Sequence, residues 1–185
     1  MRGKLIGGLS LALLLFFSLS SSAGTGKVHK YIGITKCKMC HQTAARGKQY
    51  QKWASGPHAK AYKTLATPEA KEVAKKAGVK GDPQKAAECL VCHVTAYNAP
   101  ASQKAPTYKM EDGVTCEACH GPGSDYWSLK VMKGITAGTI DPASVGMTKP
   151  DEKTCVTCHN KKSPTYKPFD YKKYYAQIAH PRPKK

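Results

Sequence analysis

The chain has 185 residues, which fits one domain, and its 41% hydrophobic and 8% aromatic content is low for a core built from side chains alone. We therefore expect a group other than side chains to fill the interior. Thirty basic residues against twelve acidic ones give a formal net charge of +18. Only three of the basic residues are arginine. Because arginine is the residue best suited to bidentate recognition of phosphates and bases, this composition argues against a nucleic-acid-binding protein.

The first residues of the chain, 1–23, have the pattern of a secretory signal peptide. A basic start is followed by an apolar stretch over 5–17 and by a small-residue cleavage site ending at Ala23. The apolar stretch is shorter than the roughly 20 residues that span a bilayer. We therefore expect residues 24–185 to form one exported domain that has no membrane span and works in the periplasm or outside the cell.

Four copies of the pattern C-x-x-C-H follow. Two thiols three residues apart face the same way on one helical turn and can reach the two vinyl groups of one porphyrin, and the next histidine can bind its iron. This spacing is the attachment signature of c-type haem. The predicted thioether cysteines are Cys37, Cys40, Cys89, Cys92, Cys116, Cys119, Cys155 and Cys158. The predicted proximal iron ligands are His41, His93, His120 and His159.

Structural zinc and disulfide bonds are the alternative interpretations of the eight cysteines. Zinc ribbons also use C-x-x-C pairs, but a histidine after every pair would then have to arise by chance four times. A disulfide between cysteines three residues apart suits a single redox motif rather than four copies that each precede a histidine. The sequence therefore predicts four haem c groups, numbered here 1 to 4 in the order of their motifs.

The remaining segments predict short helices and loops. The fold class is accordingly mainly α with long irregular loops, in a single multihaem cytochrome c domain organised around four stacked haems. The best-marked helix follows Thr67, because Pro68 stands in the favoured first turn and Gly78 ends it. The segment 97–112 contains two prolines and predicts a loop or a short hairpin. Helices are expected over 44–54, 58–65, 68–76, 125–133 and 169–179.

Three histidines lie outside the motifs, and all three are predicted distal iron ligands: His58, His180 and His29. Imidazole is the side chain of this sequence that binds ferric iron best, but three histidines cannot serve four irons. At least one iron is therefore expected to be five-coordinate or to take a Met, a Lys or a histidine of another subunit. The candidate methionines are Met110, Met132 and Met147.

The lysine-rich surface predicts the kind of partner. A ferric haem with both propionates ionised carries one net negative charge, so the chain stays strongly basic with four haems bound. We expect this surface to steer the protein toward redox-partner proteins with acidic docking surfaces.

The order of these residues resembles the cytochrome c-554 type of tetrahaem cytochrome. The run His58-Ala-Lys-Ala after Trp53 and the second motif, which reads CLVCHV, both fit the resemblance. Its most specific part is GVTCEACHGPG over 113–123. The resemblance covers nearly the whole mature chain and implies a mostly helical protein with closely stacked haems that carries electrons in the periplasm.

Carried over by position, the resemblance also implies distal ligands. His58 would serve haem 3, His180 would serve haem 4, and haem 2 would be five-coordinate. In the family a histidine shortly after the Gly-Pro-Gly turn serves haem 1, and this chain has none there. His29 is expected in its place, within the chain or toward a neighbouring subunit, with Met132 or Lys130 as weaker replacements.

The sequence therefore predicts an electron-transfer protein rather than an enzyme. One alternative is a subunit of an extracellular conducting cytochrome filament, a homo-oligomer in which a histidine would bridge subunits. Another is a small-molecule (nitrogen oxide) reductase acting at a five-coordinate haem. The reductase interpretation is weakened because arginine is scarce for holding anions and the chain has no C-x-x-C-K motif.

Overall fold

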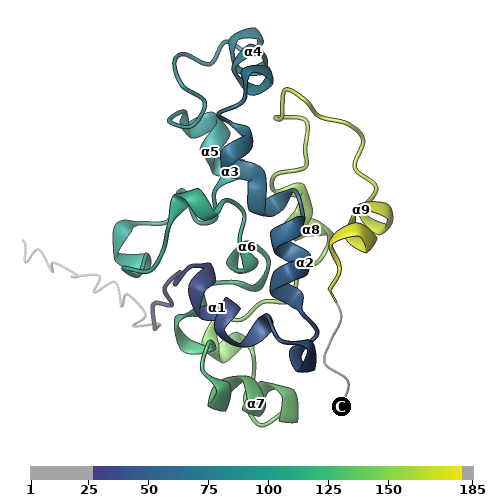
Figure 1. Ribbon diagram of the computed structural model, residues 1–185. Helices are drawn as coiled ribbons and strands as arrows, with labels where there is room; N and C mark the ends of the chain where they lie inside the picture. Colours follow the sequence, from purple (N-terminus) through teal and green to yellow (C-terminus); the bar gives the residue numbers. More distant parts are fainter. Residues whose placement is uncertain (1–26, 181–185) are drawn as a thin grey trace, which may run out of the picture.

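The computed structural model describes residues 27–180, so the expected signal peptide over 1–23 lies outside the described residues. Short α-helices and three-residue 3-10 turns are joined by long irregular loops (Figure 1). Within 27–180 the only extended pairing is an isolated parallel bridge between Tyr31 and Lys104. The predicted fold class, mainly α with irregular loops, is confirmed.

Nine α-helices lie within the described part of the chain. They are α1 Ile34–His41, α2 Gln49–Ser55, α3 Ala61–Thr64, α4 Pro68–Lys76, α5 Ala87–His93, α6 Cys116–His120, α7 Leu129–Ala137, α8 Glu152–Val156 and α9 Tyr171–Ile178. The 3-10 turns are η1 Ala44–Arg46, η2 His58–Lys60, η3 Ala101–Gln103, η4 Met110–Asp112, η5 Gly123–Asp125 and η6 Ala143–Val145. Across 27–180 no helix is long and apolar enough to cross a membrane.

The haem motifs lie on four of these helices. The first three motifs each end their helix, so that α1, α5 and α6 stop at the motif histidine. The fourth begins on α8 and continues into the turn after it. Figure 1 shows α3, α4 and α5 at one end of the molecule and α7 at the other, with α1, α2, α6 and α8 between them.

The helix predicted over 68–76 is confirmed as α4, residue for residue. Thr67 caps it by accepting a hydrogen bond from the backbone N–H of Ala70. The helix predicted over 44–54 is broken into η1 and α2, because Gly47 and Lys48 both adopt a positive φ between them.

Two other expected helices differ at their ends. The helix predicted over 125–133 begins later, since Ser128 caps α7 through the N–H of Val131, and it runs on to a left-handed Gly138. The last helix begins two residues late because Asp170 caps α9. The segment 58–65 forms η2 followed by α3, and 97–112 is loop with two 3-10 turns and no hairpin.

The side-chain core is small, as the composition suggested. A cluster of Leu65, Leu90 and Val94 lies between α3 and α5, next to the second haem motif. Much of the remaining interior is a cavity of about 1490 Å³. Motifs 1 and 3, together with Cys155 of motif 4, line this cavity.

Candidate multihaem site

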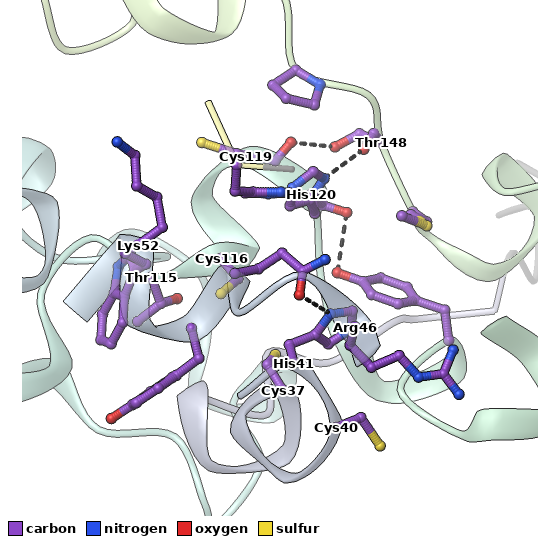
Figure 2. Close-up of a pocket in the computed structure, with 18 of the residues that line it drawn as sticks. Cys37, Cys40, His41, Arg46, Lys52, Thr115, Cys116, Cys119, His120 and Thr148 are labelled. Atoms are coloured by element: carbon purple, nitrogen blue, oxygen red, sulfur yellow. Dashed lines mark hydrogen bonds between the residues drawn. The ribbon is translucent and has the colours of Figure 1, made fainter. Parts of the chain in front are cut away.

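The cavity brings distant haem motifs together. Figure 2 shows the first motif, with Cys37 and His41, facing the third, with Cys116 and His120. Four of the seven histidines line the cavity, namely His41, His58, His120 and His180. So do five of the eight motif cysteines: Cys37, Cys40, Cys116, Cys119 and Cys155. Thiols and imidazoles are the donors that c-type haem requires, so the residues present fit this group.

The motif cysteines adjoin one another in a definite order. The thiols of Cys37 and Cys116 are neighbours, and Cys116 lowers the pKa of Cys37, so motifs 1 and 3 adjoin. Cys92 and Cys158 are also neighbours, which brings motifs 2 and 4 together, and burial together with Cys158 raises the pKa of Cys92 to about 11. Burial and then the thiols of motif 4 raise the pKa of Cys119. The motifs therefore follow one another in space as 1, 3, 4 and 2.

Two motif histidines each face a histidine from elsewhere in the chain. The ring centroids of His58 and His159 lie 6.1 Å apart, and those of His120 and His180 lie 6.0 Å apart. Two imidazoles that bind one metal from opposite sides through bonds of about 2 Å have centroids about 6 Å apart. Both pairs are therefore spaced to hold one iron each.

These pairs differ from the ligand assignment that the resemblance implied, and both assignments stay predictions. His180 lies beside His120 of motif 3 rather than His159 of motif 4, and His58 lies beside His159. The cause is α9. Phe169, just before this helix, stacks on His159 at 4.8 Å, and the eight residues of α9 then carry the chain roughly 12 Å onward to the cavity beside motif 3.

Three of the motif histidines are oriented through Nδ1. Each places this nitrogen beside an oxygen that accepts its proton, so that Nε2 is left to bind a metal. The contacts are His93 to the carbonyl of Ala61 at 2.7 Å, His41 to Oε1 of Gln49 at 3.3 Å, and His120 to the carbonyl of Thr148 at 3.4 Å. Figure 2 shows the contact between His120 and Thr148.

Burial also favours the protonation state that iron binding needs. It lowers the pKa of His58, His120 and His159, because a buried charge is poorly solvated. Repulsion from the charge of His159 lowers the pKa of His58 further. All three side chains are thereby held toward the neutral imidazole that coordinates metals.

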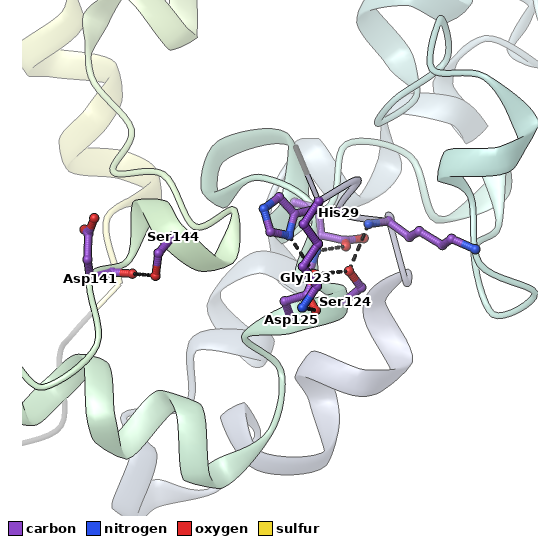
Figure 3. Close-up of polar contacts among 9 residues, drawn as sticks. His29, Gly123, Ser124, Asp125, Asp141 and Ser144 are labelled. Carbon is purple, nitrogen blue, oxygen red and sulfur yellow. Dashed lines mark hydrogen bonds and ion pairs between the residues drawn. The ribbon is translucent and has the colours of Figure 1, made fainter. Parts of the chain in front are cut away.

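His29 occupies a different place. Its Nδ1 lies 2.6 Å from Oδ2 of Asp125, which also pairs with Lys27, and Figure 3 shows this contact beside Ser124. A Cβ on Gly146 would lie 2.7 Å from the His29 ring, so the ring packs directly on that glycine. His29 does not line the cavity. Its predicted role as a distal ligand stays a prediction.

Asp125 gives a pH prediction. Lys27, followed by hydrogen bonds from His29 and Ser124, lowers the pKa of Asp125 to about 2. A carboxyl with a lower pKa in the folded state stabilises the fold above its unfolded pKa, and this contribution is lost as the pH falls through the folded pKa. Acid titration of the unfolding free energy should therefore show a steeper loss between about pH 4 and pH 2 in the wild type than in Asp125→Asn.

The exposed residue Glu72 of α4 supplies the control for this titration. Glu72→Gln is expected to keep the wild-type profile. Parallel profiles for the wild type and Asp125→Asn would show that the carboxylate contributes nothing to stability.

Glu117 is a site residue that the sequence reasoning missed. It stands between the two cysteines of motif 3, is 2% exposed, and accepts three backbone hydrogen bonds. Their donors are Ile32 at 2.8 Å, Gly33 at 2.8 Å and Gly123 at 2.7 Å. Burial raises the pKa of Glu117, and the three N–H donors oppose that shift. Because Gly33 immediately precedes α1, this side chain fastens motif 1 to motif 3.

His93 lies in apolar surroundings next to the core cluster. Cys89 of its motif packs against Leu65, Leu90 and Val94 together with Met110. Among the ring contacts within 27–180, none joins His93 to a second histidine. Motif 2 thus differs from motifs 3 and 4, each of which has a histidine facing its own.

The chain is similar to known cytochromes. The family model described as cytochrome c554 and c-prime matches residues 36–121, which include the first three motifs. Cytochrome c-554 of Nitrosomonas europaea is 32% identical over 168 residues, covering 84% of this chain and 68% of that protein. No solved structure matches the chain. The chain belongs to the cytochrome c-554 family and is a haem-based electron-transfer protein with covalently bound c-type haem.

Proposed function

We propose that this protein is a periplasmic carrier that moves electrons through four haems in the spatial order 1, 3, 4 and 2. The observation that supports this order is the adjacency of the motif cysteines. Cys37 contacts Cys116, Cys92 contacts Cys158, and Cys119 lies close to motif 4. Thioether links at these positions would bring the edges of successive porphyrins close together. An electron would then pass between neighbours without entering solvent.

The haems supply the change between ferric and ferrous iron, and the chain holds each iron. His120 and His180 would bind the iron of haem 3, and His159 and His58 that of haem 4. Two imidazoles lack the thioether that raises the potential of His/Met haems, so we expect haems 3 and 4 to have low potentials. Haem 2 would be five-coordinate, since no second histidine faces His93 within 27–180.

Haem 1 lies where an acidic partner could dock. Met39, inside motif 1, is 59% exposed, so this motif reaches the surface. Lys38 lies over the ring of Tyr50 at 5.1 Å, and Lys36 lies over the ring of Trp127 at 4.7 Å. An apolar centre with lysines around it suits a redox protein with an acidic docking surface.

The alternative functions gain less support. A filament would need a histidine donated to the next subunit, whereas His29 is 19% exposed and hydrogen-bonded to Asp125 of its own chain. A reductase would need a group to hold the anion beside haem 2, whereas the Leu65, Leu90 and Val94 cluster there is apolar. Electron transfer requires neither feature.

The haem content and the redox behaviour of the purified protein test this proposal. Pyridine haemochrome absorbance and intact mass should give four haems per chain, and protein-film voltammetry should reduce and reoxidise all of them reversibly. N-terminal sequencing should place the start of the exported chain near Gly24. Fewer than four covalent haems, or haems that are reduced on the electrode but not reoxidised, would contradict a tetrahaem carrier.

A further inference from the structure

The histidines of this chain leave haem 1 without a distal imidazole in the cavity. All seven lie within 27–180. Four belong to the motifs, and two more, His58 and His180, face His159 and His120. The seventh, His29, is held by Asp125 outside the cavity lining. The cavity that contains His41 must therefore offer a different donor if haem 1 is six-coordinate.

Two methionines line this cavity, and their surroundings differ. Met147 precedes Thr148, whose backbone N–H donates to the carbonyl of His120 and whose carbonyl faces Nδ1 of the same histidine. The backbone next to Met147 is thus held against the motif histidine of haem 3.

Met132 lies on the face of α7 that is turned into the cavity. The residues of α7 at 129, 132, 133, 135, 136 and 137 line it, mostly at the three- and four-residue spacing of one helical face, and the half-buried Met132 is one of them. Lys36 of α1 lies over the ring of Trp127 just before α7, so the helix that bears motif 1 adjoins the segment that leads into α7. Lys130 does not line the cavity.

We propose that the thioether of Met132 is the sixth ligand of haem 1. This inference rests on the tetrahaem carrier proposed above and adds a direction of electron flow along its haems. Ligation by His and Met raises the reduction potential of a haem above that of a bis-imidazole haem. Haem 1 would then be the most oxidising centre of the row. Electrons entering at haems 2, 4 or 3 would collect at haem 1, beside the exposed Met39 and the lysines around it.

The experiment combines a redox titration with far-red absorption and magnetic circular dichroism of the oxidised holoprotein. The wild type should show one haem of higher potential and one methionine-to-ferric-iron charge-transfer band, corresponding to a single haem of the four. Met132→Leu should abolish the band and move only that component to lower potential. Met132→His should also abolish the band but keep haem 1 low-spin.

Matched methionine variants make the test specific. Met39→Leu, within motif 1, and Met147→Leu, in the same cavity, should both retain the band and the high-potential component. Absence of the band from the wild type, its survival in Met132→Leu, or its loss in Met147→Leu would overturn the assignment. The haem count and the reversibility of reduction, recorded on the same samples, report on the carrier function separately, so a failed ligand assignment is distinguishable from a failed carrier.

Discussion

Replacing His180 with alanine is expected to convert haem 3 from low-spin to high-spin and to leave haem 4 unchanged, whereas His58→Ala is expected to do the reverse. The reason is that His180 faces His120 with ring centroids 6.0 Å apart, while His58 faces His159 at 6.1 Å. Low-temperature EPR of the oxidised protein should show one low-spin signal replaced by one high-spin signal of equal spin count in each variant. His29→Ala is the control and should leave both signals intact, because His29 lies outside the cavity lining.

A background without haem 4 identifies which haem each variant affects. When Cys155 and Cys158 are both changed to alanine, His180→Ala should still produce the new high-spin signal and His58→Ala should produce none. The opposite pattern would restore the pairing that the family resemblance implied. If the haem-deficient background does not fold, proton NMR of the paramagnetically shifted ligand resonances in the two single variants makes the same distinction.

Replacing Glu117 with alanine is expected to lower the free energy of unfolding by at least about 3 kcal/mol, because three buried N–H groups lose their acceptor and each costs about 1–3 kcal/mol. Glu117→Gln should cost less. Its amide oxygen can still accept from Ile32 and Gly123, as Oε1 of the carboxylate does, but its NH₂ group then faces the N–H of Gly33. Denaturant unfolding of the haem-loaded protein, monitored in the Soret band, measures both effects.

Glu88 offers a matched control for this prediction. Glu88 stands next to the first cysteine of motif 2, and Glu117 stands next to the first cysteine of motif 3. Unlike Glu117, Glu88 is exposed. Glu88→Ala should change stability by no more than about 0.5 kcal/mol. Equal stabilities for Glu88→Ala and Glu117→Ala would show that the buried carboxylate does not hold motifs 1 and 3 together.

The features that could be predicted from the sequence are local ones. Each C-x-x-C-H motif spans five residues, so its predicted role in haem attachment depends on local spacing alone. The bounds of α4 follow from Thr67 and Pro68, which act on adjacent residues. The late start of α7 also has a local cause, which is the Ser128 cap.

The features that could not be predicted depend on contacts between distant residues. The N–H of Ile32 donates to Glu117, which lies 85 positions away in the sequence. A glutamate between two motif cysteines does not by itself predict that contact. The proximity of His180 to His120 rather than to His159 depends on how Phe169 packs and how far α9 then carries the chain. Counting histidines predicts a shortage of distal ligands, and the structure adds that His29, the histidine expected at haem 1, does not line the cavity that contains His41.

The spatial order of the haems is tested most directly by locating the irons in crystals of the haem-loaded protein by anomalous diffraction at the iron edge. We predict four irons in the order 1, 3, 4 and 2, with the iron of haem 3 between His120 and His180 and that of haem 4 between His159 and His58. An arrangement in which the iron bound by His41 has another haem than haem 3 as its nearest neighbour, or in which His180 binds the iron of His159, would contradict this account.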